Sequence, residues 1–541
     1  MKLAISPISS ILTSRKIGVN PQMVSTFQGL ETARRGMFTQ QSALNTTGQN
    51  IANANTPGYS RQRVNFEQTE PYPPASMNRP QIPGQTGTGV QAGSVQRVRE
   101  TFLDVQYRGE NNSLGYWQSR ADSLEKMEEI MNEPSETGLS KTLDRFWQSL
   151  QDLAVNPSNA GARSVVRQRG MAVAETFNYL SDSLQSIQQD LKTELDITVK
   201  EVNSIANQLN NVNKQIGEIE PHGYLPNDLY DERDRLMDQL SSLVDVKVTP
   251  VKSGGNALEI ADGKFTVEIL DPSGNAIGTL VDATTNNVNT MTINYNATNT
   301  LVESFDIGSS TGNLISSFTS SGELRSLIDS YGYTDSTGTT ESGLYPEMLQ
   351  NLDEMAYTFA TEFNRVHNAG WSISNIDEAA NGVTPKTEYN FFEIDPANKA
   401  GTADRIKLDQ DIINSLDNIA AAGDNNGSAT LGDGSNAVAL GAARSGLLMI
   451  DGNSTTIQSY YESVIGGMAV NAQEANRLSN NSDTLRQAVD DRRQSVSAVS
   501  IDEEMTNMIK FQHAYNASAR MITVTDELLD KIINGMGRAG R

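Results

Sequence analysis

Three histidines are the side chains of this 541-residue chain best suited to binding a metal or moving protons near neutral pH. They are His222, His367 and His513, which lie far apart in the sequence. None has a second histidine or a pair of carboxylates at the spacing of metal ligands. A lone histidine among helical or loop residues is more often structural than functional, so the histidines predict neither a metal site nor acid-base catalysis.

Acidic and glycine-rich segments offer three further patterns. Residues 228–235 mix four carboxylates with two arginines, which indicates a solvated helix face rather than an acid-base pair. Residues 87–92 match a loose dinucleotide-binding pattern, but Pro83 precedes them and no helical pattern follows, so they predict a hairpin turn. Residues 424–427 lack the alternating oxygen ligands of a calcium loop. We therefore expect no catalytic residue, cofactor or metal, and a protein that is not an enzyme.

The composition excludes several classes of protein. A net charge of −24 and a pI near 4.6 argue against nucleic-acid binding, which needs a clustered basic surface. The chain has no cysteine, which excludes disulfide scaffolds and thiol chemistry and suits either a reduced cytosolic protein or one exported unfolded. No run approaches the roughly 18 apolar residues of a membrane-spanning helix, so we expect no membrane insertion. Residues 1–65 and 496–541 are close to neutral or weakly basic, so the acidity lies in the interior.

An amphipathic helix is predicted near the N-terminus. Apolar side chains follow one heptad track after Met23: Phe27, Leu30, Met37, Leu44 and Ile51. Arg34, Gln41 and Gly48 fill the other positions of this track and weaken it. Residues 1–22 make a poor secretory signal and Met23 has the character of a natural start, so the place of residues 1–22 in the mature chain stays open.

A sharp turn is predicted where this helix ends, because residues 50–62 read NIANANTPGYSRQ. The turn-forming residues are Asn53, Asn55, Thr56, Pro57 and Gly58. Asparagine and glycine tolerate positive φ, and a proline extends the residue before it. Tyr59 has two interpretations: its ring packs under its own turn, or it contacts a neighbouring subunit.

A second amphipathic helix is predicted at about 501–533. Its seam follows the same 4-3 rhythm, with Ile501 at the start and then Met505, Met508, Tyr515, Ala519, Ile522, Leu529 and Ile533. Gln512 and Asp526 interrupt this seam. Ser500 with Glu503 forms a capping-box pattern, and Asn534 with the following glycine supplies a stop. The two terminal helices can pair within one chain as a coiled coil, or their interrupted seams can be completed by other chains.

The interior alternates helical and β patterns, which indicates an α+β multidomain protein. Helical spacing covers about 101–132, 139–156 and 160–219, returns over 322–330 and 343–369, and closes the interior over about 455–495. The expected domains are an extension of uncertain status at 1–22, a terminal helical assembly domain of 23–65 with 496–541, an elongated helical rod-like domain of 66–243 with 322–370 and 456–495, a β-rich insertion at 244–321, and a β-rich or loop insertion at 371–455.

The two ends resemble the rod, hook and junction proteins of the bacterial flagellar axis. The turn carries the family's pattern at Asn50, Asn53, Asn55, Thr56, Gly58 and Tyr59, and residues 501–535 are similar to its closing helix. Within that family, the interior segments NDLYDERDRLMDQLSSLVDVKV, GELRSLIDS and LDEMAYTFATEFNRVHNAGW, at 227–248, 322–330 and 352–371, resemble the hook-associated protein 1 family.

This resemblance implies a structural protein of the hook–filament junction that is exported by the flagellar type III apparatus and lies outside the cell. It implies a ring of identical subunits, with the hook protein, a second junction protein and an export chaperone as partners. The terminal helices and the turn would form the assembly interface. The alternatives are a hook or rod protein and, from other classes, an enzyme or adhesin displayed on the flagellum through the β insertions.

Overall fold

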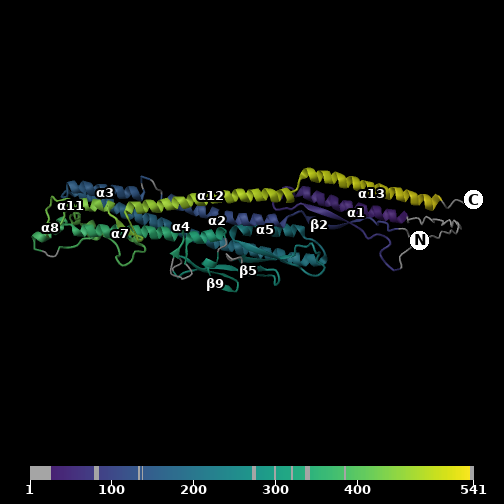
Figure 1. Cartoon of the computed structure of the whole chain (residues 1–541), viewed down its shortest axis with the longest axis horizontal. Coiled ribbons are helices and arrows are strands. Elements are labelled where there is room, and N and C mark those ends of the chain that lie inside the picture. The colour runs from purple at the N-terminus through teal and green to yellow at the C-terminus, as the bar shows by residue number, and fades with distance from the viewer. Residues whose placement is uncertain are drawn as a thin grey trace, which may run out of the picture. The chain divides into compact units, whose positions relative to one another are not determined.

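The computed structural model describes residues 26–77, 84–131, 135–136, 138–270, 276–297, 300–318, 321–334, 341–382 and 386–535. Residues 1–22 and Met23, whose status the sequence left open, lie outside this part of the chain. The chain divides into two compact units: residues 1–99 with 497–541, called unit 1, and residues 100–496, called unit 2. Figure 1 labels their helices and strands.

Unit 1 contains helix α1 (Thr26–Ala52), strands β1 (Gln62–Gln68) and β2 (Val90–Arg97), and helix α13 (Ile501–Gly535). The two strands pair antiparallel. The helices lie side by side (Figure 1) and run antiparallel: Asn50 bonds Glu504 at one end, and a Cβ on Gly36 would lie 3.2 Å from the Ser518 hydroxyl further along. The predicted pairing of the terminal helices is confirmed.

The predicted start of α13 is nearly the observed one. The Ser500 hydroxyl accepts the backbone N–H of Glu503 at 3.5 Å, which is one half of a capping box. The other half is replaced, because the Glu503 carboxylate bonds Arg61 at 3.0 Å. Glu503, which the capping pattern identified, therefore joins α13 to Arg61, the residue before β1.

The expected boundary between the terminal domain and the rod-like domain moves from residue 65 to residue 99. Residues 62–68 pair with 90–97, so the segment 66–99 belongs to the terminal helices and not to the rod. The ring of Phe66 on β1 packs edge-on against Phe511 of α13, with centroids 5.9 Å apart. The predicted hairpin turn at 87–92 is wrong for residues 90–92, which lie in β2, and no local pattern indicated that β2 pairs with residues 62–68.

Unit 2 is built on long helices: α2 (Thr101–Met131), α3 (Leu139–Val155), α4 (Ala160–Ile219), α5 (Asn227–Leu243), α6 (Glu323–Tyr331), α7 (Leu344–Ala369) and α12 (Ile457–Ser497). A short 3-10 turn, η1 (Glu220–His222), joins α4 to α5. Asn159 caps α4 by accepting the N–H groups of Gly161 and Ala162, directly after the Asn156-Pro157 stop. At 60 residues, α4 spans about 90 Å and provides a spine for the unit.

Two small sheets cover residues 246–342. One has the order β3 (Val246–Val251), β4 (Lys264–Leu270), β5 (Ala276–Asp282), β6 (Asn287–Val288). The other has the order β11 (Glu341–Ser342), β10 (Tyr333–Thr334), β8 (Val302–Ile307), β7 (Met291–Tyr295), with β9 (Ser310–Leu314) on β8; a 3-10 turn, η2 (Ile315–Ser317), follows. Their buried residues belong to the same hydrophobic core as the helices. The strands therefore do not form a domain with a separate core at 244–321.

Residues 371–455 consist mostly of loops and short helices and are not β-rich. The helices are α8 (Ile373–Ala380), α9 (Thr402–Arg405), α10 (Gln410–Asn414) and α11 (Ser435–Ala442), with 3-10 turns η3 (Leu416–Asn418) and η4 (Ala443–Ser445). Two short strand pairs are present, β12 (Phe392–Glu393) with β13 (Lys407–Leu408) and β14 (Leu448–Ile450) with β15 (Asn453–Thr455). Phe391 and Phe392 anchor the segment in an aromatic cluster around Phe146 and Phe363.

The charged segment 228–235 is not the solvated face that its pattern indicated. Arg233 is fully buried, its guanidinium carbon 3.3 Å from the centroid of the Phe265 ring, and it donates to the Gly263 carbonyl at 2.7 Å. Asp234 is also buried and pairs with Arg108 of α2 at 3.3 Å. Because α5 packs between α2 and α4, its charges face partners on other elements, which a single-helix pattern cannot show.

His367 is a buried structural residue of α7. Its Nε2 accepts the N–H of Ala420 at 2.9 Å, and its Nδ1 lies 2.8 Å from the carbonyl oxygen of Tyr389. Burial lowers the pKa of His367 to about 4. Among the described residues, no helix combines the length and the continuous apolarity needed to cross a bilayer.

The buried imidazole predicts an acid-sensitive step in the stability of unit 2. An unfolded histidine has a pKa of about 6.5, so the unfolded chain binds more protons than the native chain between about pH 6.5 and 4. Stability is therefore lost as the pH falls through this window, by up to about 3 kcal/mol. Denaturant unfolding of His367→Gln should show a shallower fall than the wild type. His222→Gln, at an exposed histidine, is the control. Equal pH profiles for the wild type and His367→Gln would contradict the assignment.

Candidate assembly interface

Asn50, near the end of α1, bonds the turn, β1 and α13. Its side-chain N–H₂ donates to the Gln62 carbonyl at 2.8 Å and to the Glu504 carboxylate at 3.2 Å. Its side-chain oxygen accepts the Gln62 N–H at 3.0 Å and the Tyr59 hydroxyl at 2.9 Å. The residue is 1% exposed, so all these bonds form away from water. One amide thus links α1, the turn, β1 and α13.

Arg61 and Glu504 extend this cluster to the start of α13. The Arg61 Nε donates to Glu504 at 2.8 Å, and another guanidinium nitrogen donates to Glu503 at 3.0 Å. The backbone N–H of Arg61 bonds the Ser497 carbonyl, and its carbonyl accepts the N–H of Val98. Burial of Arg61 lowers its pKa, the two glutamates raise it, and the net direction is upward. The side chain of Glu504 is 3% exposed, so its charge depends on Arg61 and Asn50.

The predicted turn has the geometry that its residues suggested. Gly58 has a φ of +82°, which a glycine adopts without steric cost. The Thr56 hydroxyl bonds the Asn53 side chain at 3.1 Å, and the Tyr59 N–H bonds the Thr56 carbonyl. Tyr59 is half-buried with its hydroxyl on Asn50. This favours the interpretation in which its ring packs under its own turn, while a role for Tyr59 in a subunit contact stays a prediction.

The predicted apolar track of α1 is not the face that α1 buries. The buried residues are Thr39, Ala43, Thr47 and Asn50. Leu30, Met37, Leu44 and Ile51 are half-buried, and Phe27 is 63% exposed. The reason is the hairpin: Thr39 donates to the Val90 carbonyl at 3.1 Å, so small polar side chains let the helix approach a strand backbone.

The predicted seam of α13 divides into two groups. Met508, Tyr515, Ala519, Ile522 and Leu529 are half-buried, whereas Met505 and Ile533 are 54% and 70% exposed. The buried positions that the seam missed are Glu504 and Thr525. Apolar periodicity cannot identify Glu504 as buried. The available signal was its place directly after Glu503, which the capping pattern had identified.

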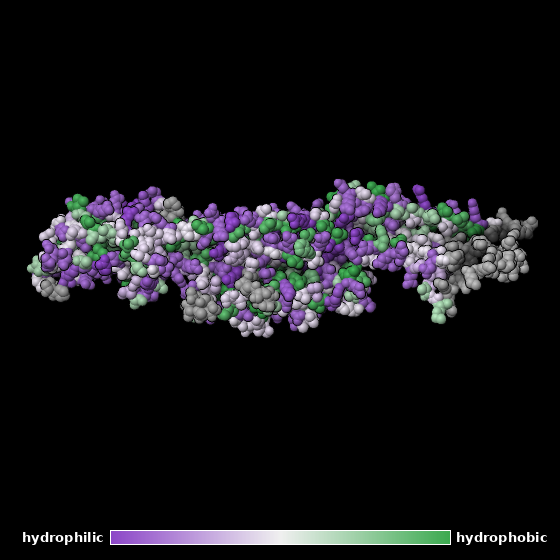
Figure 2. Space-filling view, in the orientation of Figure 1, coloured by the Kyte–Doolittle hydropathy of each residue, from purple (hydrophilic) through white to green (hydrophobic). Residues whose placement is uncertain are grey.

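Large apolar side chains of α13 are also exposed, in one group near its start and another near its end. Its exposed large apolar residues are Ile501, Met505, Ile509, Met521, Val524, Leu528, Ile532 and Ile533, each at least 46% exposed. Figure 2 shows hydrophobic side chains among hydrophilic ones over this helix. On α1, Phe27 and Phe38 are 63% and 55% exposed. At 100° per residue these side chains spread around the helix, and exposed charged residues such as Lys510 and Arg520 lie between the two groups. Exposed apolar side chains in this number are typical of a helix that has further partners. We call this set of α13 residues the outer stripe.

Unit 2 also holds a wide groove of about 1040 Å³ beside α4 and α7. Its polar lining groups are engaged with one another: Lys399 pairs with Glu354 at 3.0 Å, Asp353 accepts the N–H groups of Gly401 and Ala403, and Gln188 donates to the Tyr331 carbonyl. These contacts hold loops against helices. The groove offers no nucleophile placed beside a base, so the outer stripe is the better candidate for a functional surface.

Removing Arg61 should weaken the attachment of α13 within unit 1. Arg61→Ala leaves the buried Glu504 carboxylate without its cation, which costs about 3–5 kcal/mol. We expect hydrogen exchange of residues 501–515 to accelerate in Arg61→Ala while exchange in α4 stays unchanged. Arg63→Ala, at an exposed arginine two residues further on in β1, is the matched control. Unchanged exchange at 501–515 would show that the cluster does not hold the helix.

Three family models match the chain. Residues 124–380 match the flagellar hook-associated protein FlgK helical domain, residues 492–535 match the C-terminal model of the flagellar basal body rod FlgEFG proteins, and residues 30–59 match the flagella basal body rod protein model. The two terminal matches cover much of α1, the turn and α13. The elements of unit 1 that the geometry singles out are thus the ones shared with rod proteins.

Whole-chain relatives agree with these models. The chain is 50% identical over 532 residues to flagellar hook-associated protein 1 of Bacillus subtilis (strain 168), covering 96% of this chain and 100% of the relative. It is 23% identical to the Escherichia coli (strain K12) protein of that name, over 93% of this chain and 99% of the relative. The hook junction protein FlgK from Burkholderia pseudomallei has a similar fold, with a TM-score of 0.55 at 14% identity over 74% of this chain and all of that one. The chain belongs to the flagellar hook-associated protein 1 family.

Proposed function

We propose that this protein is a non-enzymatic structural subunit of the junction between the hook and the filament, and that it assembles through its terminal helices. The observation that carries the proposal is the outer stripe of α13. The inner face of this helix is already seated on α1 and on Phe66 of β1. The large apolar side chains of α13 that stay exposed outside this contact favour a second partner.

Neighbouring copies of the same unit fit the outer stripe. Its side chains are aliphatic and thioether groups, which suits close packing against a like surface. A ring of identical subunits uses one surface of each copy repeatedly, so the stripe on one copy would pack on the exposed flank of its neighbour's α1, near Phe27 and Phe38. The predicted track of Leu30, Met37, Leu44 and Ile51, which is half-buried, would complete its burial in the same contact.

The buried cluster of Asn50, Arg61 and Glu504 prepares this surface. It sets the pairing of α1 with α13 inside one subunit, so a neighbour meets a helix pair of fixed register. A preset surface lowers the ordering cost of association. The assembly residues proposed from the sequence thus separate into a group that forms the pair, such as Ile522 and Leu529, and a group that faces outward, such as Met505 and Ile533.

Family membership supports the wider setting of this role. We propose that the subunit is exported through the flagellar type III apparatus and lies outside the cell. Its neighbours would be the hook protein and a second junction protein, with an export chaperone holding the chain before export. The absence of cysteine suits a chain that passes a narrow channel unfolded.

A charge in the outer stripe should block assembly without unfolding the subunit. Leu528 is 52% exposed, so Leu528→Glu should leave the circular dichroism and melting of the free protein near those of the wild type. In the assembled ring the same carboxylate would be buried without a partner, which costs several kcal/mol per contact. We expect Leu528→Glu cells to lose swimming motility, while Leu528→Met, which keeps the size and polarity, stays motile. Motile Leu528→Glu cells would exclude the outer stripe as the interface.

Deleting the gene tests the position of the protein in the flagellum. We expect electron micrographs to show hooks without filaments, and flagellin in the medium. Missing hooks would instead assign the protein to the hook or rod. Normal filaments would mean that the terminal helices only direct the protein to the flagellum and that the function lies in the insertions, as an enzyme or adhesin would require.

A further inference from the structure

The chain passes between the two units twice, near residues 99–100 and 496–497. The first crossing leads directly into α2, which begins at Thr101, and the second leaves α12, which ends at Ser497. Any force that travels along the backbone between the units therefore enters unit 2 through the first turns of α2 and the last turns of α12. The contacts between these turns of α2 and α12 decide how independently the two helix ends can move.

Helix α12 is held in two different ways along its length. From Ile457 to Ala475 it contributes Ile457, Tyr461, Met468, Ala472 and Ala475 to the main hydrophobic core. Beyond Ala475 its buried residues are Ser479, Ser482 and Val489, none of which belongs to that core. The Ser479 hydroxyl bonds Gln118 of α2 at 3.0 Å. The last five turns of α12 thus rest on α2 through polar groups, with little apolar burial to hold them.

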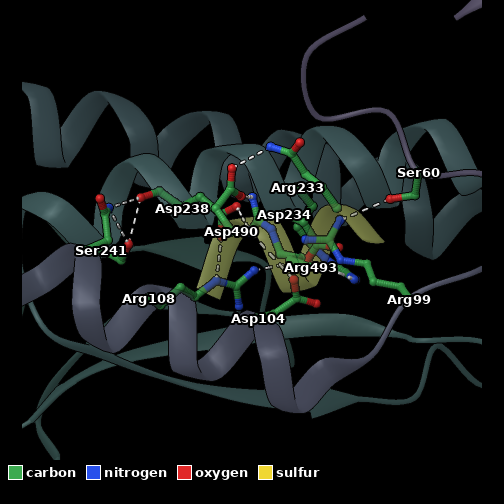
Figure 3. A network of polar contacts seen from close by, with 12 residues as sticks. Ser60, Arg99, Asp104, Arg108, Arg233, Asp234, Asp238, Ser241, Asp490 and Arg493 are labelled. Carbon is green, nitrogen blue, oxygen red and sulfur yellow. Dashed lines mark hydrogen bonds and ion pairs between the residues drawn. The ribbon is translucent and has the colours of Figure 1, made fainter. Parts of the chain in front are cut away.

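An ionic cluster replaces the missing apolar contact (Figure 3). Asp238 of α5 is its centre: Arg493 of α12 donates to one carboxylate oxygen at 2.6 Å, and Arg108 of α2 donates to the other at 2.9 Å. Arg493 also lies 3.6 Å from Asp104 of α2 and 3.4 Å from Asp490 of its own helix. Three helices that are distant in sequence therefore meet on two guanidinium groups.

The charge balance of the cluster makes Arg493 its critical member. Arg108 pairs with Asp234 and Asp238, and Arg233 lies 3.9 Å from Asp234, whereas Arg493 pairs with Asp104, Asp238 and Asp490. Without Arg493, Asp104 and Asp490 would face Asp238 with less compensation, and like charges repel. The guanidinium carbon of Arg493 also lies 4.0 Å from the centroid of the Tyr107 ring on α2. The side chains of Arg108 and Arg493 are 14% and 18% exposed, so salt can reach the cluster.

We propose that this cluster is a latch that holds residues 483–497 of α12 on α2 and α5, and that it opens locally while the rest of unit 2 stays folded. A closed latch fixes the spacing of the two chain crossings. An open latch lets residues 483–496 of α12 leave α2, while the backbone of Arg61 still bonds Ser497 and Val98 beside the two crossings. The latch does not depend on the proposed place of the protein in the flagellum.

Hydrogen exchange of the full-length protein tests whether opening is local. Arg493→Gln should accelerate amide exchange in residues 483–497 by about tenfold or more and leave residues 457–475 unchanged. Arg477→Gln is the matched control on the same helix, because Arg477 is 61% exposed and its pair with Glu474 is long, at 3.7 Å. Unchanged exchange at 483–497, or an equal rise at 457–475, would overturn the proposal.

A distance measurement on a folded wild-type background provides a second, independent test. The chain has no cysteine, so Val105→Cys on α2 and Arg492→Cys on α12, both at exposed positions, can carry spin labels at unique sites. We expect a narrow distance distribution in low salt that broadens to longer distances near 1 M NaCl, where charges are screened within about 3 Å. A distribution that salt does not change would refute the latch, even if Arg493→Gln proved too unstable to study.

Discussion

The hydrogen bond from Asn50 to Glu504 joins residues 454 positions apart, and the arrangement of the whole chain depends on closing that distance. Unit 1 is built from both ends of the sequence, so the chain must leave it after residue 99 and re-enter it at residue 497. The long helices of unit 2 meet this requirement, because α2 begins just after the first crossing and α12 ends at the second. The β segments lie between these two helices in sequence and leave the closure undisturbed.

This dependence explains why the polar cluster at Asn50 is buried. A pair of helices that packs only through apolar side chains can slide in register, since each position offers a similar surface. Asn50, Arg61 and Glu504 can satisfy one another in one register only, because a shift would leave a carboxylate and a guanidinium without partners. The apolar residues then stabilise the helix pair by packing, and the buried charges fix its register.

The sequence predicted the helices well and their environment less well. Helix ends follow local chemistry, so Ser500 could be identified as a cap and the Asn156-Pro157 stop as a boundary without any tertiary information. The face that a helix buries follows from its neighbours. Thr39 and Thr47 are buried because a strand backbone lies beside α1, and Arg233 is buried because Phe265 and Gly263 come to meet it. The β1–β2 hairpin and the short helices of 371–455 were missed for the same reason: turn-forming residues predict where the chain bends and not what it bends towards.

The small side chains along the buried line of α1 have a consequence for how this surface can change in evolution. Gly36 faces the Ser518 hydroxyl, where a Cβ would come within 3.2 Å, and Ala43 is 1% exposed. The size of a few residues therefore fixes the distance between α1 and α13. Enlarging one of them would widen the pair. In the proposed ring of identical subunits, the same displacement would be repeated at every copy. We therefore expect such positions to accept a change of polarity more readily than a gain in volume.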